Sequence, residues 1–400
     1  MAKGRVSLAG GTSRGLVLDL IRSRGPISRV ALAEATGLTQ ATMSTVVRRL
    51  IDDGLIVETG RGESTGGKPP VMVDVNPSSR FAVGVHLGRE SITYVVVDLT
   101  GAVLGRTRTV APESTDPPDM IADIAEQIDR ALEALDVRKE SVLGVGIAAP
   151  GPLDLERGVV LHSAHLQTWL DVPLRPLLAD ATGLPVILEN DANGAALGDF
   201  WNGRLAGAVS HASVYMGSGI GAGLLIDGIV FRGASSNAGE LGRVIVTGPD
   251  GEPAALEDVA DPAAVVRRAR QLGEADRLGL GGPAVYDDFR TIALAAMRGD
   301  DGAARLIDES AQHLATGVLA LASLIDVDSV SLTGPAFAIA GPTYVQVMRD
   351  RLDRYFASRV GHPVRVQLSA DVVDSAATGA AALVLQTELA PRTMGLSTKA

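Results

Sequence analysis

The chain has 400 residues, which exceeds the usual size of a single domain, so we expect two or three hydrophobic cores. It contains no cysteine, which excludes disulfides, thiolate metal sites and cysteine nucleophiles and is typical of a reducing compartment. The N-terminus lacks the apolar core of a secretory signal, and no apolar stretch is long enough to span a bilayer. We therefore expect a cytoplasmic protein.

The charge is distributed unevenly along the chain. The formal net charge is -11, but residues 1–75 carry ten Lys or Arg and seven Asp or Glu, a local charge of +3. The remaining 26 basic and 40 acidic residues give -14. A mildly basic head on an acidic body favours contact with DNA through the head alone, since phosphates repel the body.

Three helices are predicted in the first 75 residues. Apolar residues recur at helical spacing in 12–24, and Gly25-Pro26 stops that pattern. Ser28 is a suitable N-cap for a second helix that ends at Gly37. Thr39 begins a third helix with an apolar stripe, and Gly54 ends it. The second and third helices with their turn form a helix-turn-helix pattern.

The third helix has the polar side chains that a reader of the major groove needs. Hydroxyl and amide groups near its start would face base edges and phosphates, with arginines near the DNA backbone. The predicted DNA-contacting residues of this helix are Thr39, Gln40, Thr42, Ser44, Thr45, Arg48 and Arg49.

A β-hairpin wing is predicted after the third helix. Two alternating apolar runs in 55–75 flank a basic tip rich in glycine, in which Arg61 and Lys68 would enter a minor groove or bind phosphate. The alternative is a three-helix bundle with a hairpin that packs against a partner protein. The order, the lengths and the charge favour a winged helix-turn-helix that binds DNA.

After a linker at 76–80, the remaining chain reads as a mixed α/β body. Two strands in 81–104, with a hairpin turn at Gly101, precede a helix over about 118–135 and a buried strand that ends near Gly151. A later strand ends in a polar cluster that begins a helix, and a pair of strands rich in glycine follows. This opening resembles the actin-like ATPase fold.

Three motifs narrow the resemblance: Glu189-Asn190-Asp191-Ala192-Asn193, the loop 217–223 (GSGIGAG), and Asn237-Ala238-Gly239-Glu240-Leu241-Gly242. With them, essentially the whole chain resembles the ROK family of repressors and sugar kinases. It is similar to the regulator branch, which includes N-acetylglucosamine and xylose repressors and places a winged helix before the kinase-like body. The resemblance implies a two-lobed sugar kinase-like domain.

Carboxylates and carboxamides at a strand end suit the hydroxyls of a sugar. The resemblance makes Asp191 the match of the family's catalytic base, here expected to bind sugar, and implies sugar contacts for Asn190, Glu240 and Glu257. Asn190 and Asp191 would also cap a helix, and the two roles are compatible. The loop 217–223 would let backbone N–H groups approach a phosphate, which by itself is a weak indication.

The chain departs from the kinases of this family at the phosphate loop. Their Asp-x-Gly-Gly-Thr motif corresponds here to His86-Leu87-Gly88-Arg89-Glu90, and Pro335 stands where a second glycine of the adenosine loop is expected. These replacements put the wrong charges against Mg-ATP, and phosphoryl transfer depends on positioning and electrostatics. We therefore expect no kinase activity and no catalytic residue.

The family's structural zinc site is also expected to be lost. Arg243, Gly248, Asp250 and Ala255 stand at its histidine and three cysteine positions. One carboxylate does not make a zinc site, so we expect no metal ion and no other cofactor. Arg243 remains a candidate for ligand contact, with pairing to Glu240 as the alternative.

We expect an α/β chain with a winged helix-turn-helix over 1–75, a linker over 76–80 and a ROK sugar-binding domain over 81–400. Its first lobe would span about 81–195 with a C-terminal helix at about 375–388, and its second lobe about 196–374.

The expected function is that of a transcriptional repressor, a homodimer that binds operator DNA and responds to a sugar. The alternatives are an ATP-dependent sugar kinase with an accessory DNA-binding domain and a regulator controlled by a protein partner.

Overall fold

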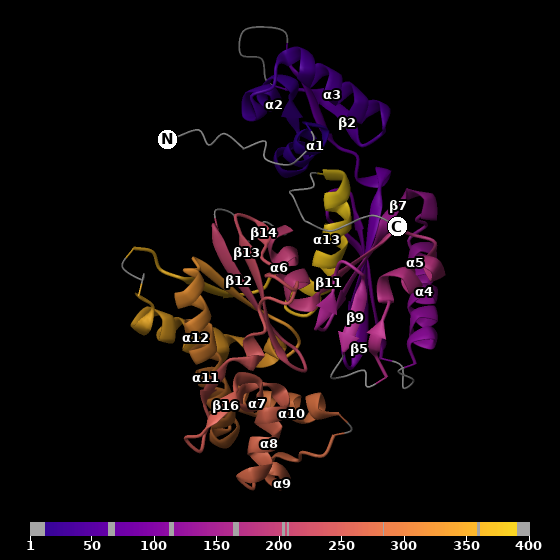
Figure 1. Cartoon of the computed structure of the whole chain (residues 1–400). Coiled ribbons are helices and arrows are strands. Elements are labelled where there is room, and N and C mark those ends of the chain that lie inside the picture. Colours follow the sequence, from indigo (N-terminus) through magenta and orange to yellow (C-terminus); the bar gives the residue numbers. More distant parts are fainter. Residues whose placement is uncertain are drawn as a thin grey trace.

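The computed structural model describes residues 13–62, 69–111, 116–162, 168–201, 205, 208–282, 284–357 and 361–389, without the side chains of 387–389. It places a small head at one end of a two-lobed body (Figure 1). The head contains α1 (Ser13–Arg24), β1 (Ile27–Ser28), α2 (Arg29–Thr36), α3 (Gln40–Asp52), β2 (Ile56–Arg61) and β3 (Val71–Val75).

The three predicted helices of the head are confirmed, and their ends follow the predicted local chemistry. The Ser28 hydroxyl accepts the Ala31 N–H, and α2 ends at Gly37 with φ 73°. The Thr39 hydroxyl caps α3 by accepting the Thr42 N–H. The predicted hairpin is also confirmed, because β2 pairs antiparallel with β3. The short β1, which the sequence did not predict, adds a third strand to this sheet.

The first lobe is built on a five-stranded sheet in the order β11-β7-β4-β5-β6. Strands β4, β7 and β11 are parallel, whereas β5 and β6 continue β4 as an antiparallel meander. Helices α4 and α5 cover one face of this sheet, and α13 covers the other (Figure 1). The main elements are β4 (Phe81–Leu87), β5 (Ser91–Asp98), β6 (Val103–Val110), α4 (Pro117–Ala134), β7 (Val142–Ala149), α5 (Leu174–Thr182), β11 (Val186–Asn190) and α13 (Ser375–Leu389).

Short elements complete the first lobe. A small antiparallel sheet has the order β10-β9-β8. These elements are the 3-10 helices η1 (Pro77–Ser79) and η2 (Lys139–Ser141), with β8 (Leu153–Asp154), β9 (Val159–His162) and β10 (Leu170–Val172).

The second lobe repeats the topology of the first. Its five-stranded sheet has the order β14-β13-β12-β17-β18, with β12, β13 and β14 antiparallel and β12, β17 and β18 parallel. Two lobes with the same sheet define the predicted actin-like architecture. The strands and the helix that follows them are β12 (Ser210–Met216), β13 (Ile220–Ile226), β14 (Ile229–Val230), β17 (Ser329–Thr333), α12 (Phe337–Tyr355) and β18 (Arg365–Leu368).

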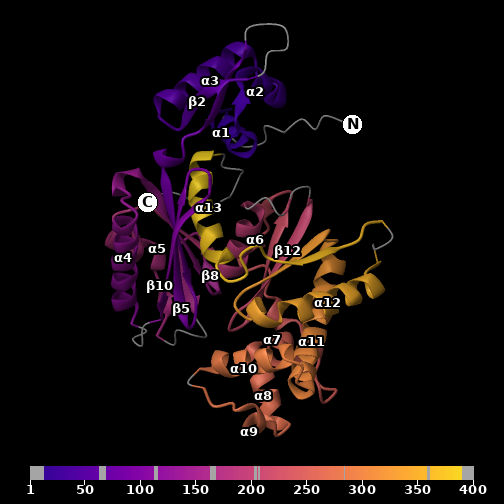
Figure 2. The same cartoon turned by 180° about the vertical axis from the view of Figure 1, so that it is seen from behind.

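A helical group extends the second lobe away from the head, as both views show (Figures 1 and 2). It contains η3 (Leu241–Arg243), β15 (Ile245–Thr247), β16 (Pro253–Ala255), α7 (Leu256–Ala260), α8 (Pro262–Gln271), α9 (Ala275–Leu278), α10 (Val285–Met297) and α11 (Asp301–Ile325). Met348 and Leu352 of α12 are buried in this lobe's core.

Two helices lie between the sheets of the lobes. Helix α6 (Asp191–Trp201) packs on β12 and β13 of the second lobe, and α13 packs on β4 and β7 of the first. Where they cross, a Cβ on Gly379 would lie 1.7 Å from the Gly194 carbonyl oxygen, so only glycine permits this approach. The predicted lobe boundary between 195 and 196 falls inside α6, and we move the proposed boundary to the start of this helix.

No helix among the described residues is long and apolar enough to cross a membrane.

Candidate functional site

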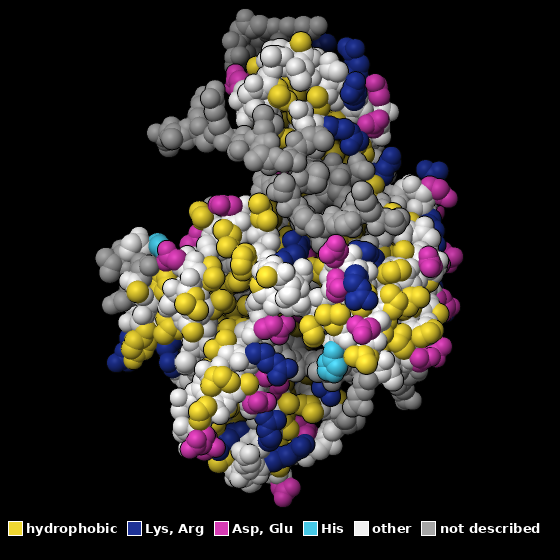
Figure 3. Space-filling view, in the orientation of Figure 1, with side chains coloured by type: hydrophobic (Ala, Val, Ile, Leu, Met, Phe, Trp, Pro, Cys, Tyr) yellow, Lys and Arg dark blue, Asp and Glu magenta, His cyan; other side chains and the backbone are white. Residues whose placement is uncertain are grey.

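The surface expected to contact DNA lies on the part of the head farthest from the lobes. Helix α1 faces the body, whereas α2 and α3 lie farther out (Figure 1). Every predicted contact residue of α3 is exposed, while Met43, Val47 and Leu50 are buried against the head. Arg61 is exposed at the end of β2, and Lys68 lies outside the described residues. Lys and Arg side chains lie along one side of the head (Figure 3).

A cleft of about 320 Å³ separates the two lobes, near the lower limit for ligand pockets. Its walls come from the turn after β4, the end of β7, the start of α6, the β12–β13 turn, η3 and α7. Of the predicted ligand-binding residues, the cleft lining includes Asn190, Asp191, Glu240, Arg243 and Glu257.

Asn190 and Asp191 occupy the junction where β11 ends and α6 begins. The Asn190 Oδ1 atom accepts the N–H groups of Ala192 and Asn193 at 3.0 and 3.3 Å, so this side chain does cap the helix. The Asp191 Oδ1 atom accepts the Ala192 N–H at 2.8 Å. Burial raises the pKa of Asp191 to about 7, and the nearby Glu240 carboxylate acts in the same direction. Asp191 can therefore change protonation near neutral pH.

Glu189, whose role sequence reasoning missed, holds this junction in place. Its side chain is fully buried, and Oε2 accepts Nη2 and Nε of Arg232 at 2.5 and 3.1 Å. Its Oε1 atom accepts the Asn190 N–H at 2.9 Å and Asn193 Nδ2 at 3.0 Å. A glutamate at the end of an otherwise apolar strand was the available signal, but its arginine partner is 43 residues away.

The remaining predicted ligand residues face one another on the second lobe. Arg243 Nη1 lies 3.1 Å from Glu257 Oε1, so Arg243 pairs with Glu257 rather than with Glu240, the partner considered from the sequence. The Arg243 side chain is 71% exposed, which leaves much of its guanidinium open to the cleft or to solvent. Burial raises the pKa of Glu240, and Arg243 opposes this effect. The side chains of Asn190 and Glu240 both lie close to Gly151. A Cβ atom on Gly151 would be 3.5 Å from Asn190 Nδ2 and 3.5 Å from Glu240 Oε1.

The predicted zinc positions do not fit a zinc ion. Arg243 presents a paired cation, and neither Gly248 nor Ala255 has a donor side chain, which leaves Asp250 as a single carboxylate. No group of three or more acidic or histidine side chains suited to a metal occurs among the described residues.

The motif containing Glu240 also joins the two lobes. Asn237 Oδ1 accepts the Leu153 N–H at 2.8 Å, and Asn237 Nδ2 donates to the Leu153 carbonyl at 3.0 Å. Leu153 belongs to β8 of the first lobe, so this asparagine links the lobes instead of facing a ligand.

Another part of the cleft lining consists of groups that contact each other across the lobes. His86 of β4 is buried, and its Nε2 atom lies 3.3 Å from the Tyr215 hydroxyl of β12. Burial lowers the pKa of His86 to about 4, so the ring is neutral at pH 7. The Glu90 carboxylate is hydrogen-bonded to the backbone of Tyr286, at the start of α10.

Ion pairs lie beside His86 and Tyr215 in the cleft lining. Arg108 of β6 pairs with the buried Asp374, which Arg106 Nη1 also contacts at 2.8 Å. Pro335 lines the wall beside them. Arg106 and Arg108 are already paired with Asp374, and His86 is neutral at pH 7. With the Glu90 carboxylate beside them, these groups do not provide the metal and phosphate contacts that Mg-ATP requires. The residues present here therefore do not fit that nucleotide.

Trp169, directly before the short β10, is 1% exposed and belongs to the core of the first lobe, as its residue type favours. His165 and Gln167 of the same segment lie outside the described residues.

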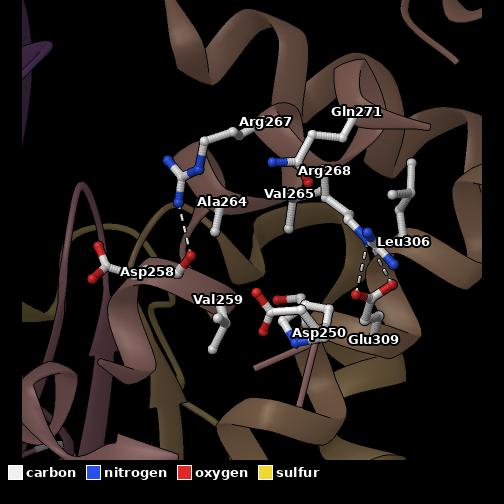
Figure 4. A pocket seen from close by; sticks show the side chains of 12 residues that line it. Asp250, Asp258, Val259, Ala264, Val265, Arg267, Arg268, Gln271, Leu306 and Glu309 are labelled. Atoms are coloured by element: carbon white, nitrogen blue, oxygen red, sulfur yellow. Dashed lines mark hydrogen bonds and ion pairs between the residues drawn. The ribbon is translucent and has the colours of Figure 1, made fainter. Parts of the chain in front are cut away.

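A second pocket of about 250 Å³ lies within the second lobe, between α7, α8, α11 and the β15–β16 turn (Figure 4). Its arginines have partners, because Arg268 Nε lies 3.0 Å from Glu309 Oε1 and Arg267 donates to the Asp258 carbonyl at 2.7 Å. We assign no ligand to it.

Comparison with known proteins relates both parts of the chain to regulators. The ROK family profile matches residues 82–387, and the MarR family profile matches residues 13–59. The xylose repressor of Caldicellulosiruptor bescii is 28% identical over 85% of this chain and 86% of its own length.

Solved structures of a regulator and of a kinase share the fold. A ROK family transcriptional regulator, a homolog of the E. coli MLC protein, has a TM-score of 0.73 and 25% identity over 94% of this chain and 96% of its own. A ROK family glucokinase from Streptomyces griseus, in complex with glucose and AMPPNP, has a TM-score of 0.65 and 29% identity over 76% of this chain and 98% of its own. The profile match to 306 of the 400 residues, together with this shared architecture, shows that the chain belongs to the ROK family.

Proposed function

We propose that the protein is a transcriptional repressor whose affinity for operator DNA is controlled by a sugar bound in the cleft between its lobes. One observation carries this proposal: the cleft lining keeps a set of carboxylate and carboxamide groups from Asn190, Asp191 and Glu240, while other polar groups in the same lining are paired with each other. The exposed face of α3 supplies the surface that would read DNA.

The proposed sugar contacts come from both lobes. Asn190 ends β11 of the first lobe, whereas Asp191, at the start of α6, belongs to the second lobe together with Glu240, Arg243 and Glu257. Carboxylates accept hydrogen bonds from sugar hydroxyls, and the carboxamide can both donate and accept. A sugar held between these groups would favour one degree of lobe closure, and it would shift DNA affinity by its differential binding to the two states.

We further propose that the protein acts as a cytoplasmic homodimer and is not an enzyme. Paired half-sites give a helix-turn-helix its specificity, which favours a dimer. The related glucokinase was solved with glucose and AMPPNP, but the altered phosphate loop of this chain, with His86, Arg89 and Glu90, does not fit Mg-ATP. Incubation with Mg-ATP and each sugar should give no phosphorylated sugar above the level of a blank.

The sugar-controlled function is tested by fluorescence anisotropy on DNA from the region upstream of the protein's own coding sequence. The titrants are D-xylose, D-glucose, N-acetylglucosamine and the phosphorylated form of each hexose. We expect one of them to weaken DNA binding on the order of 5-fold to 150-fold, the usual range of allosteric coupling. The same sugar should have no effect on Asp191→Ala.

A DNA of equal length and scrambled sequence is the control for specificity. Tight, sequence-specific binding that no sugar changes would retain the DNA-binding head and move control to a protein partner. Binding that does not distinguish the two DNAs would contradict the operator proposal.

A further inference from the structure

Helix α6 runs from the sugar end of the cleft to the DNA-binding head. Its first residue, Asp191, lines the cleft, and its last residue, Trp201, lies beneath α1 of the head. Eleven residues of helix span about 16 Å. A single rigid element therefore contacts both the proposed ligand site and the head.

Helix α6 is attached to the second lobe near both of its ends. Asp199 is 1% exposed, and its carboxylate accepts the hydroxyls of Ser331 and Ser369, each at 2.5 Å. Ser331 lies on β17, and Ser369 follows β18. A Cβ on Gly223 of β13 would lie 2.1 Å from the Ala192 carbonyl oxygen, so strand and helix are in direct contact. Buried hydrogen bonds to a carboxylate are strong, and α6 should move with the second lobe.

The far end of α6 contacts the head through one side chain. The Arg22 guanidinium of α1 lies 4.0 Å from the centre of the Trp201 ring, within the range of a cation–π interaction. Arg22 is held over the ring by Asp19, whose carboxylate lies 3.1 Å from Nη2. The Arg22 side chain is only 15% exposed, which strengthens such a contact relative to one in open solvent.

The head is attached to the first lobe in a different way, through apolar packing. Its core residues Leu18 and Ile21 belong to the same hydrophobic cluster as Ala381 and Leu385 of α13 and Val97 of β5. In both views α13 lies directly beneath α1 (Figures 1 and 2). Trp201 packs in this same cluster, so the head meets α6 and the first lobe side by side, and of these two contacts only the one with α6 includes a cation.

We propose that the Arg22–Trp201 contact transmits the position of the second lobe to the DNA-binding head, so that movement of α6 relative to α13 changes the orientation of α3. This inference rests on the proposed control by sugar and names its route. The apolar attachment to α13 keeps the head on the first lobe, and the cation–π contact adds a smaller interaction that depends on lobe closure. A contact of this size can bias two arrangements without locking either.

The test compares two changes on one helix. Arg22→Met removes the cation over Trp201 but keeps a long apolar side chain, and Arg24→Met removes an equal charge from the exposed last turn of α1. Operator affinity is measured with and without the active sugar from the panel above, and sugar affinity is measured by calorimetry. We expect sugar affinity to stay within about twofold in both variants.

The ratio of operator affinities with and without sugar separates the variants. It should fall about threefold to fivefold towards 1 in Arg22→Met, the size of one cation–π contact, and stay at the wild-type value in Arg24→Met. A ratio in Arg22→Met equal to that of the wild type would overturn the inference and leave the proposed function intact.

A measurement without sugar covers the case in which no sugar acts on the wild type. Ser369→Ala weakens the attachment of α6 to the second lobe, so Arg22→Met, Ser369→Ala and the double variant form a cycle for operator affinity. If α6 transmits lobe position to the head, the two changes are coupled by at least about twofold. Additive effects in variants that unfold at the wild-type temperature would refute the route even if sugar control had already failed.

Discussion

Two neighbouring parts of the interlobe cleft contain similar side chains in different arrangements: one part contains Asp191, Glu240 and Arg243, and the other contains His86, Tyr215, Arg108 and Asp374. At the sugar end, Asp191, Glu240 and the exposed Arg243 leave polar atoms facing the cleft. In the other part, which we call the filled end, His86 contacts Tyr215, and Arg108 pairs with Asp374. These polar groups therefore already have protein partners. The comparison supports the proposal that this kinase-like cleft binds a sugar but no nucleotide.

The strongest way to break this comparison is to remove the carboxylate at the sugar end. Asp191→Ala should weaken sugar binding by about 10-fold to 100-fold, because a charged hydrogen-bond acceptor is lost from a partly buried site. Calorimetry with the active sugar measures the change. Glu90→Gln is the matched substitution of a carboxylate at the other end, and equal losses in the two variants would contradict the division of the cleft.

Lowering the pH should reduce the stability of the protein, in part through the buried, neutral His86 at the filled end. Burial lowers the pKa values of His86 and of His211, in the core of the second lobe, to about 4, against 6.5 for the free side chain. Because the unfolded chain binds these protons more tightly, stability is retained above pH 6.5 and falls as the pH drops towards 4. Each histidine should contribute a loss on the order of 2 kcal/mol by pH 5.

Urea unfolding at pH 7 and pH 5 measures this loss. His86→Phe keeps an aromatic ring beside Tyr215 and should reduce the pH-dependent loss by about half of the combined contribution. His162→Gln changes an exposed histidine and serves as the control. An unchanged pH dependence in His86→Phe would show that the charge state of this ring is not what acid changes.

Sugar binding should also weaken on acidification, but over a higher pH range than the loss of stability. With the pKa of Asp191 at about 7, its ionised fraction rises roughly tenfold between pH 6 and pH 8, and sugar hydroxyls donate best to the ionised form. We expect sugar affinity to increase by up to about tenfold over this interval, measured by calorimetry in buffers of equal ionic strength. Asp191→Asn should bind sugar weakly at both pH values, and a variant that kept the full pH dependence would rule out Asp191 as its source.

The smallest effect is expected where a turn of the first lobe meets the second. Glu90→Gln weakens the hydrogen bond to the Tyr286 backbone and should lower stability by about 0.5–1 kcal/mol, measured by urea unfolding. Sugar affinity should stay within about threefold, because the change lies at the filled end. A larger fall in sugar affinity would show that this link sets the degree of lobe closure.

The head illustrates how far local sequence information reaches. Ser28, Gly37 and Thr39 act within three or four residues along the chain, and the apolar stripe of α3 follows from helical spacing. These short-range interactions are the same in any fold that contains the segment, so the helices and their ends were predicted correctly. The missed strand β1 is only two residues long and depends on pairing with β3 across more than forty residues.

The candidate site could be predicted in membership but not in its internal pairing. The motifs and the family resemblance identified Asn190, Asp191, Glu240 and Glu257, and the structure brings them to one cleft. It also pairs Arg243 with Glu257 and gives Asn237 a role between the lobes. A motif specifies which residue types are present, whereas the partner of a long side chain depends on which elements pack beside it.

By itself the sequence determined the helix-turn-helix, the ROK motifs and the altered phosphate loop, because these depend on residue type and short spacing. The tertiary structure alone decided the ion pair of Glu189 with Arg232, the bonds from Asp199 to Ser331 and Ser369, and the position of Arg22 over Trp201. Those contacts join residues 43 to 179 positions apart. Many pairings are compatible with one sequence over such separations, and only close packing of the two lobes and the head selects among them.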